Sequence, residues 1–192
     1  MKCPSCGTPF AAPVPECPRC SLTLQRLDAK FGAVPLHTRY LTDRSGKLPL
    51  PAIRKLRGFL QIFEKKFPQS VFSVFVTDYV PGGSISEYTF WLANRARLSP
   101  LDAVAGDNFD LLLGINLESG DAALTAGYGL ENYLAENDLE SALDSARNAI
   151  RGGDILRGVH ACVQFMMTRL REIVKANEPR TSVPAAVTNE DY

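Results

Sequence analysis

Apolar side chains run almost without interruption through residues 109–117, and this pattern predicts a strand that is buried on both faces. Turn-forming residues follow at 118–121, and a second strand of small residues is predicted at 122–128. The hairpin ends in Gly127-Tyr128-Gly129, where the glycines permit unusual backbone conformations before a short helix near Leu130. We expect the rest of the chain to be organised around this hairpin.

Apolar residues at helical spacing predict helices at 52–67, from 84 to about 98, from Asn137-Asp138 to the glycines at 152–153, and at 155–175. In the second of these, Ser84 and Glu87 form a predicted capping box. Its buried stripe is predicted to be Ile85, Tyr88, Leu92 and Ala96, with the single tryptophan, Trp91, near the edge of that stripe. A further interior strand is predicted within 71–80. The order of these elements predicts an α/β fold with a small mixed sheet flanked by helices.

Four cysteines near the N-terminus form two CxxC pairs, Cys3 with Cys6 and Cys17 with Cys20. The two-residue spacer lets both sulfurs of a pair face one ion, so the pattern predicts a zinc ribbon. Because cysteine fills all four ligand positions, the predicted zinc is structural. Disulfides are the alternative, but the N-terminus lacks the apolar core of an export signal, and we therefore expect free thiols.

The domain boundaries follow from composition. The ribbon is predicted at 1–24, and Gly32 and Pro35 indicate a linker at 25–38. The main α/β domain is predicted at 39–176, and the tail at 177–192 lacks apolar periodicity, which predicts disorder. His160 and Cys162 lie beside the apolar stripe of the last helix, where we expect structural roles.

The pair Asp107-Asn108, followed by an apolar strand, a tight turn and Ala-Gly-Tyr-Gly-Leu-Glu at 126–131, resembles the TPM domain family. The resemblance covers roughly residues 40–174 and includes the opening segment 41–48. It implies an α/β fold of a few strands flanked by helices. Roles reported in that family include phosphatase activity, calcium binding, and accessory or assembly functions. Phe109 departs from the family, where glycine is common after the Asp-Asn pair.

By the same resemblance, Asp43, Asp107 and Asn108 are candidate ligands of Ca²⁺ or Mg²⁺. Asp78 and Glu131 join them because they lie in loops near predicted strand ends, where α/β sheets bind ligands. Oxygen ligands from separate loops suit both ions, and a bound Mg²⁺ could orient a water molecule against a phosphate. The alternative is that each side chain accepts hydrogen bonds within its own turn.

The charge balance limits the classes of partner. The 192 residues include 21 basic and 21 acidic side chains, so the formal net charge is zero. No compact basic patch is visible, which argues against nucleic acid as a partner. No apolar run approaches the roughly 20 residues of a membrane-spanning helix. We therefore expect a cytoplasmic protein that makes no membrane contact and binds protein.

Two functions are consistent with these patterns. The first is a binding or accessory module that uses the loop at 127–134 and the ribbon as contact surfaces. Phe10, Val14 and Leu22 are the candidate contacts of the ribbon, unless they pack around the metal or against the main domain. The second is a divalent-metal-dependent phosphatase built on Asp43 and the Asp107-Asn108 pair.

Overall fold

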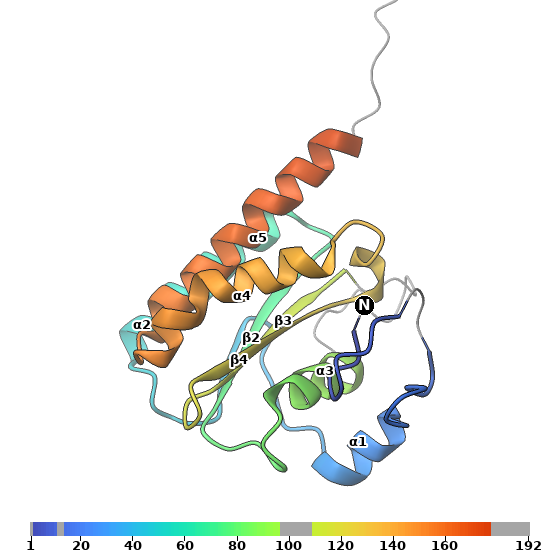
Figure 1. Cartoon of the computed structure of the whole chain (residues 1–192). Coiled ribbons are helices and arrows are strands. Elements are labelled where there is room, and N and C mark those ends of the chain that lie inside the picture. The colour runs from blue at the N-terminus through green and yellow to red at the C-terminus, as the bar shows by residue number, and fades with distance from the viewer. Residues whose placement is uncertain (1, 11–13, 97–108, 178–192) are drawn as a thin grey trace, which may run out of the picture.

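In the part of the chain that the structure describes, the sheet has four strands in the order β1 (Leu41–Asp43), β2 (Phe72–Thr77), β3 (Leu111–Asn116) and β4 (Asp121–Ala126) (Figure 1). This computed structural model describes residues 2–10, 14–96 and 109–177. β1, β2 and β3 are parallel, and β4 returns antiparallel to β3 through the predicted turn. The predicted α/β class with a small mixed sheet is therefore confirmed. The sequence did not predict β1, because a three-residue strand is too short to show a period.

Helices cover both faces of the sheet (Figure 1). On one face lie α2 (Leu50–Lys66), α4 (Glu136–Arg151) and α5 (Ile155–Asn177), and on the other lie α1 (Leu24–Phe31) and α3 (Ile85–Arg95). A short 3-10 helix, η2 (Tyr128–Leu130), follows β4 where a short helix was predicted. None of the helices in the described residues combines the length and apolarity needed to cross a membrane.

The alternation of side chains along β2 and β3 explains why two helical layers are needed. All six residues of each strand are buried. One set of side chains enters the larger core beside α2, α4 and α5: Phe72, Val74, Val76, Leu111, Leu113 and Ile115. The alternate positions Phe75 and Leu112 enter a second core beside α1 and α3. A strand pair that is apolar on both faces is stable only when both faces are covered.

Helix α1 corrects the prediction of a linker at 25–38. Its Leu27 is buried, and the Phe31 ring packs 4.9 Å from the Tyr88 ring of α3. The Asp28 carboxylate accepts hydrogen bonds from Trp91 Nε1 at 2.9 Å and from Arg95 Nε at 2.8 Å and Nη2 at 2.6 Å. The helix has only eight residues, so its apolar stripe is too short to stand out in the sequence.

Trp91 lies at the centre of the second core, whereas the sequence predicted it at the edge of the buried stripe. Its side chain is fully buried. The centroid of the Phe31 ring in α1 lies 5.2 Å from the centroid of the Trp91 ring. The prediction was wrong because it considered α3 alone, and α1 covers the side of α3 that the stripe left exposed.

The start of α4 also differs from the prediction that Asn137-Asp138 caps this helix. Ala135 is the capping residue, and Asp138 lies three positions into the helix. There the Asp138 carboxylate accepts a 2.9 Å hydrogen bond from the backbone N–H of Ala135. The next helix begins as its sequence indicates, because the Asp154 carboxylate accepts a 3.0 Å hydrogen bond from the N–H of Arg157.

Replacing Asp28 by asparagine should make stability less dependent on pH. Hydrogen bonds from Arg95 and Trp91 lower the pKa of Asp28 below its usual range. A carboxylate of this kind stabilises the fold above its unfolded pKa of about 4, and that contribution is lost as the pH falls through the lower folded-state pKa. In denaturant unfolding, Asp28→Asn should be less stable than wild type at neutral pH. A stability difference that stays constant down to about pH 2 would contradict this account.

Close contact between α3 and β3 depends on Gly114. A Cβ at this position would lie 1.9 Å from Thr89 Oγ1 and 3.1 Å from Thr89 Cβ. Thr89 is fully buried, so it has little room to move away. Glycine at this strand position therefore sets the distance between the helix and the sheet.

Gly114→Ala should lower the free energy of unfolding by about 1–3 kcal/mol, because the added methyl group overpacks the interface. The matched control is Gly58→Ala in α2, where a Cβ meets nothing within 4 Å. That change should be neutral or stabilise by up to about 1 kcal/mol, since alanine favours helix over glycine. Equal stability of the two variants in denaturant unfolding would show that the approach of α3 is not constrained at Gly114.

Candidate functional site

The four predicted cysteine ligands, Cys3, Cys6, Cys17 and Cys20, come together in one cluster. Their sulfur atoms all lie within 4.8 Å of one another. The pairs Cys3–Cys20 and Cys6–Cys17 are each separated by 3.6 Å between sulfurs. A disulfide needs about 2.05 Å, whereas four thiolates at about 2.3 Å from one tetrahedral ion lie roughly 3.8 Å apart. The cluster therefore fits a four-thiolate metal site.

Two equivalent turns present these sulfurs. The N–H of Gly7 donates to the carbonyl of Cys3 at 2.9 Å, and the N–H of Ser21 donates to the carbonyl of Cys17 at 2.8 Å. Gly7 has a φ of 71° and Ser21 a φ of 53°, so both turns close through the left-handed region. The repeated CxxC spacing thus folds into a repeated local structure.

The thiols of the cluster have different proton affinities. Burial raises the pKa of Cys3 to about 12. Hydrogen bonds from the side chain and backbone of Thr8 lower the pKa of Cys6 to about 6. Because thiolates, not thiols, bind metals, loading the cluster with an ion must release protons.

The ribbon is attached to α1 and α3 through Glu87. This carboxylate accepts a hydrogen bond from Lys30 Nζ of α1 at 2.5 Å, and Ser5 of the ribbon supplies another. Burial alone would raise the pKa of Glu87, but these hydrogen bonds and the Lys30 charge outweigh it and lower the pKa. Only half of the predicted capping box is present, because Ser84 accepts from the Glu87 N–H at 3.2 Å while the Glu87 carboxylate pairs with Lys30 instead.

A second attachment joins the ribbon to α4. Lys2 Nζ forms ion pairs with Glu140 and, at 3.9 Å, with Glu136. Of the predicted contact residues of the ribbon, Leu22 packs on the second core, whereas Val14 is 45% exposed. Phe10 and Val14 line a cavity of about 350 Å³ between the ribbon and the main domain. The ribbon is thus packed on the domain rather than separated from it by a linker.

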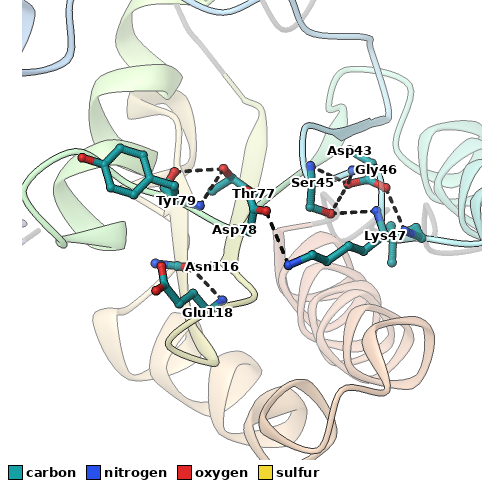
Figure 2. Close-up of polar contacts among 10 residues, drawn as sticks. Asp43, Ser45, Gly46, Lys47, Thr77, Asp78, Tyr79, Asn116 and Glu118 are labelled. Atoms are coloured by element: carbon teal, nitrogen blue, oxygen red, sulfur yellow. Dashed lines mark hydrogen bonds and ion pairs between the residues drawn. The ribbon is translucent and has the colours of Figure 1, made fainter.

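The Asp43 carboxylate holds its own loop at the end of β1 (Figure 2). Its Oδ1 accepts from the Ser45 N–H at 2.9 Å, the Ser45 hydroxyl at 2.5 Å and the Gly46 N–H at 3.0 Å. Its Oδ2 accepts from the Leu48 N–H at 3.0 Å. This is the turn-stabilising alternative weighed in the sequence analysis, and it explains why aspartate suits this position.

Other polar groups gather beside Asp43 at the carboxyl ends of β1, β2 and β3 (Figure 2). Asp78 pairs with Lys47 at 3.4 Å. Asn116, at the end of β3, is buried and accepts from the N–H of Glu118 at 3.0 Å. The sequence analysis missed Lys47 and Asn116, although a polar residue at the end of an apolar run was a usable signal. In the described part of the chain, the cysteines form the only group of three or more close metal-ligating side chains.

Asp107 and Asn108 lie outside the described residues, so a shared site with Asp43 stays a prediction. Phe109, which follows them in the chain, precedes the amino end of β3, whereas Asp43 ends β1. Because β1, β2 and β3 run parallel, Asp43 lies where the strands end and Phe109 lies where they begin, on opposite sides of the sheet along the strand direction. Glu131 follows η2 and lies on the same side as Phe109, near the amino end of β3. Burial raises the pKa of Glu131.

No protein-family profile matches the chain, and no curated protein matches it. Solved structures share its fold. The N-terminal domain of a P. gingivalis protein is 20% identical, with a TM-score of 0.58 over 81% of this chain and 92% of that one. The N-terminal domain of the cg2496 protein from Corynebacterium glutamicum is 15% identical, with a TM-score of 0.53 over 71% and 83%. The BA42 protein of Bizionia argentinensis is 9% identical, with a TM-score of 0.54 over 66% and 83%. At these identities the likeness shows the fold alone.

Asp43→Ala should lower the free energy of unfolding by about 1–3 kcal/mol, because the part-exposed loop N–H groups of residues 45–48 lose a charged acceptor. The matched control is Asp78→Ala, at the nearby carboxyl end of β2. It removes one ion pair, that of Asp78 with Lys47, from a side chain that is 43% exposed. That change should stay within about 0.5 kcal/mol of wild type. Thermal or denaturant unfolding measures both, and equal effects would show that the Asp43 loop does not depend on its carboxylate.

Proposed function

We propose that this chain is a TPM-like protein-binding module in which a zinc ribbon forms part of the binding surface. The observation that carries the proposal is the attachment of the ribbon to α3 and α4, described above. It places the ribbon beside β4, so that the ribbon, α3, β4 and α4 enclose one groove.

The groove, which we call the β4 groove, has a volume of about 390 Å³. Residues 123–126 of β4 form its floor, and residues of α3 and α4 form its walls. Figure 1 shows β4 between these two helices. Side chains from the walls and the ribbon that line it include Phe90, Ala93, Leu139, Leu143, Cys3 and Pro4. A concave lining that combines apolar side chains with polar and charged groups is suited to binding.

Zinc is the ion that best suits the cysteine cluster. Zn²⁺ accepts four thiolates in a tetrahedron, and a site with four protein ligands leaves no position for a substrate. The ribbon has no sizeable core of its own, so metal binding would supply much of its folding free energy. In this proposal the ion has a structural role, and it keeps Cys3 and Pro4 in place in the wall of the β4 groove.

The alternative is a phosphatase that uses Ca²⁺ or Mg²⁺ at Asp43 with the Asp107-Asn108 pair. It has less support, because both Asp43 oxygens already accept hydrogen bonds from residues 45–48. An ion at this carboxylate would have to compete with those donors.

Purified full-length protein should contain about one zinc ion per chain, as expected for one tetrahedral four-thiolate site. Cys17→Ser should lose most of that zinc, because it removes one of the four ligands. Cys162→Ser is the matched control, since Cys162 is buried in the main core, away from the cluster. Elemental analysis gives the stoichiometry, and zinc retention in Cys17→Ser would exclude the cluster as the site.

The binding function can be separated from the phosphatase by two assays on the same preparations. Capture from lysate of the source organism, followed by reconstitution with the purified partner, should succeed with wild type and fail with Cys17→Ser. Hydrolysis of p-nitrophenyl phosphate with millimolar Mg²⁺ should be no faster with wild type than with Asp43→Ala. Magnesium-dependent hydrolysis that disappears in Asp43→Ala would replace the binding proposal with the phosphatase.

A further inference from the structure

The outer edge of β4 carries backbone groups that the sheet does not use. Within the described ranges, β4 is the last strand in the sheet order and pairs only with β3. The N–H of Gly127 donates to the carbonyl of Asp110 at 2.8 Å, across the β3–β4 pair. Hydrogen-bonded pairs alternate along an antiparallel ladder, so Ala123 and Thr125 also face β3. The N–H and C=O groups of Ala122, Leu124 and Ala126 therefore point outward.

The outward groups of Leu124 and Ala126 lie at the floor of the β4 groove, whereas Ala122 lies just beyond its lining. Among the described residues, no backbone hydrogen bond to another segment uses them. The groove lining includes residues 123–126, so the free edge of the strand is exposed to the cavity. At the end of β4, the Tyr128 hydroxyl lies 3.4 Å from Asn94 Oδ1 of α3, which joins this end of the strand to the helix wall.

The charged side chains that line the β4 groove are mostly acidic. Glu131, Glu136 and Glu140 line the groove, whereas Lys2 is the basic residue in the lining. Lys2 already pairs with two of these glutamates. The groove thus keeps an excess of negative charge, which favours a basic occupant.

We propose that the β4 groove binds an extended, basic peptide segment of a partner protein, which adds to the sheet as a fifth strand beside β4. This inference rests on the proposed binding function and specifies its partner. Main-chain hydrogen bonds to Leu124 and Ala126 supply affinity, and the acidic side chains of the lining supply the preference for lysine or arginine.

Charge favours this occupant over two others. A second copy pairing edge to edge would bring two acidic grooves together. The tail at 178–192 carries Glu178, Glu190 and Asp191 against one Arg180, so its net charge has the same sign as the groove. The tail also contains Pro179 and Pro184, which have no N–H to donate to a strand.

The first test is amide hydrogen exchange on zinc-loaded full-length protein with a blocked ten-residue peptide of alternating valine and lysine. The amides of Leu124 and Ala126 should slow on binding, whereas that of Thr125, already bonded to β3, should not change. A peptide of alternating valine and glutamate should bind at least about tenfold more weakly, a difference of about 1.4 kcal/mol. Unchanged exchange at Leu124 and Ala126 at saturating valine–lysine peptide would overturn the proposal.

The second test removes one outward donor without touching the β3 ladder. Ala126→Pro deletes an N–H that faces the groove, in an edge strand where proline is tolerated. Ala126→Val is the matched control, because it has similar bulk and keeps the N–H. The proline variant should bind the valine–lysine peptide about fivefold more weakly than the valine variant, the usual effect of one hydrogen bond. Equal affinity of the two variants would exclude strand addition.

The other occupants give different results. Protection of Leu124 and Ala126 that rises with protein concentration, without peptide, would assign the edge to a second copy and overturn the proposal. Faster exchange at the same amides after deletion of 178–192 would assign it to the tail, with the same consequence. If neither amide responds to peptide but the captured partner still requires Cys17, the binding function stands and strand addition alone is excluded.

Discussion

The structure depends on covering both faces of β2 and β3. These strands are apolar on each side, so one helical layer would leave Phe75 and Leu112 exposed to water. Helix α3 covers this face closely because Gly114 has no side chain, and α1 completes the cover over Trp91. Since α1 follows the ribbon directly in the chain, the need to bury Trp91 also determines where the cysteine cluster lies.

The parts of the fold that were predictable have long or repeated signals. The mostly apolar runs of β2 and β3 and the helical spacing of α2 and α5 each extend over enough residues to identify the element. The CxxC spacing predicted the cysteine cluster for a chemical reason, since two such pairs suit one tetrahedral ion. β1 and α1 were missed because each is too short for a period to appear.

The properties of the candidate sites depend on contacts that no local pattern encodes. Aspartate at 43 suggested a metal ligand, but its oxygens accept hydrogen bonds within its own turn. The partner of Glu87 is Lys30, more than fifty residues earlier, so the sequence around Ser84 suggested only a capping box. The β4 groove combines the ribbon, two helices and a strand from distant parts of the chain, and single-sequence reasoning could not assemble it.

The attachment of Lys2 to Glu140 has a consequence for the order in which the protein is made. The two residues are 138 positions apart, and α4 follows all four strands in the chain. The cysteines are synthesised before α4, so the cluster can assemble while the surface that receives the ribbon is still missing. The ion pairs of Lys2 with Glu136 and Glu140 can therefore form only after α4 has been made, so docking of the ribbon follows the synthesis of every strand of the described sheet.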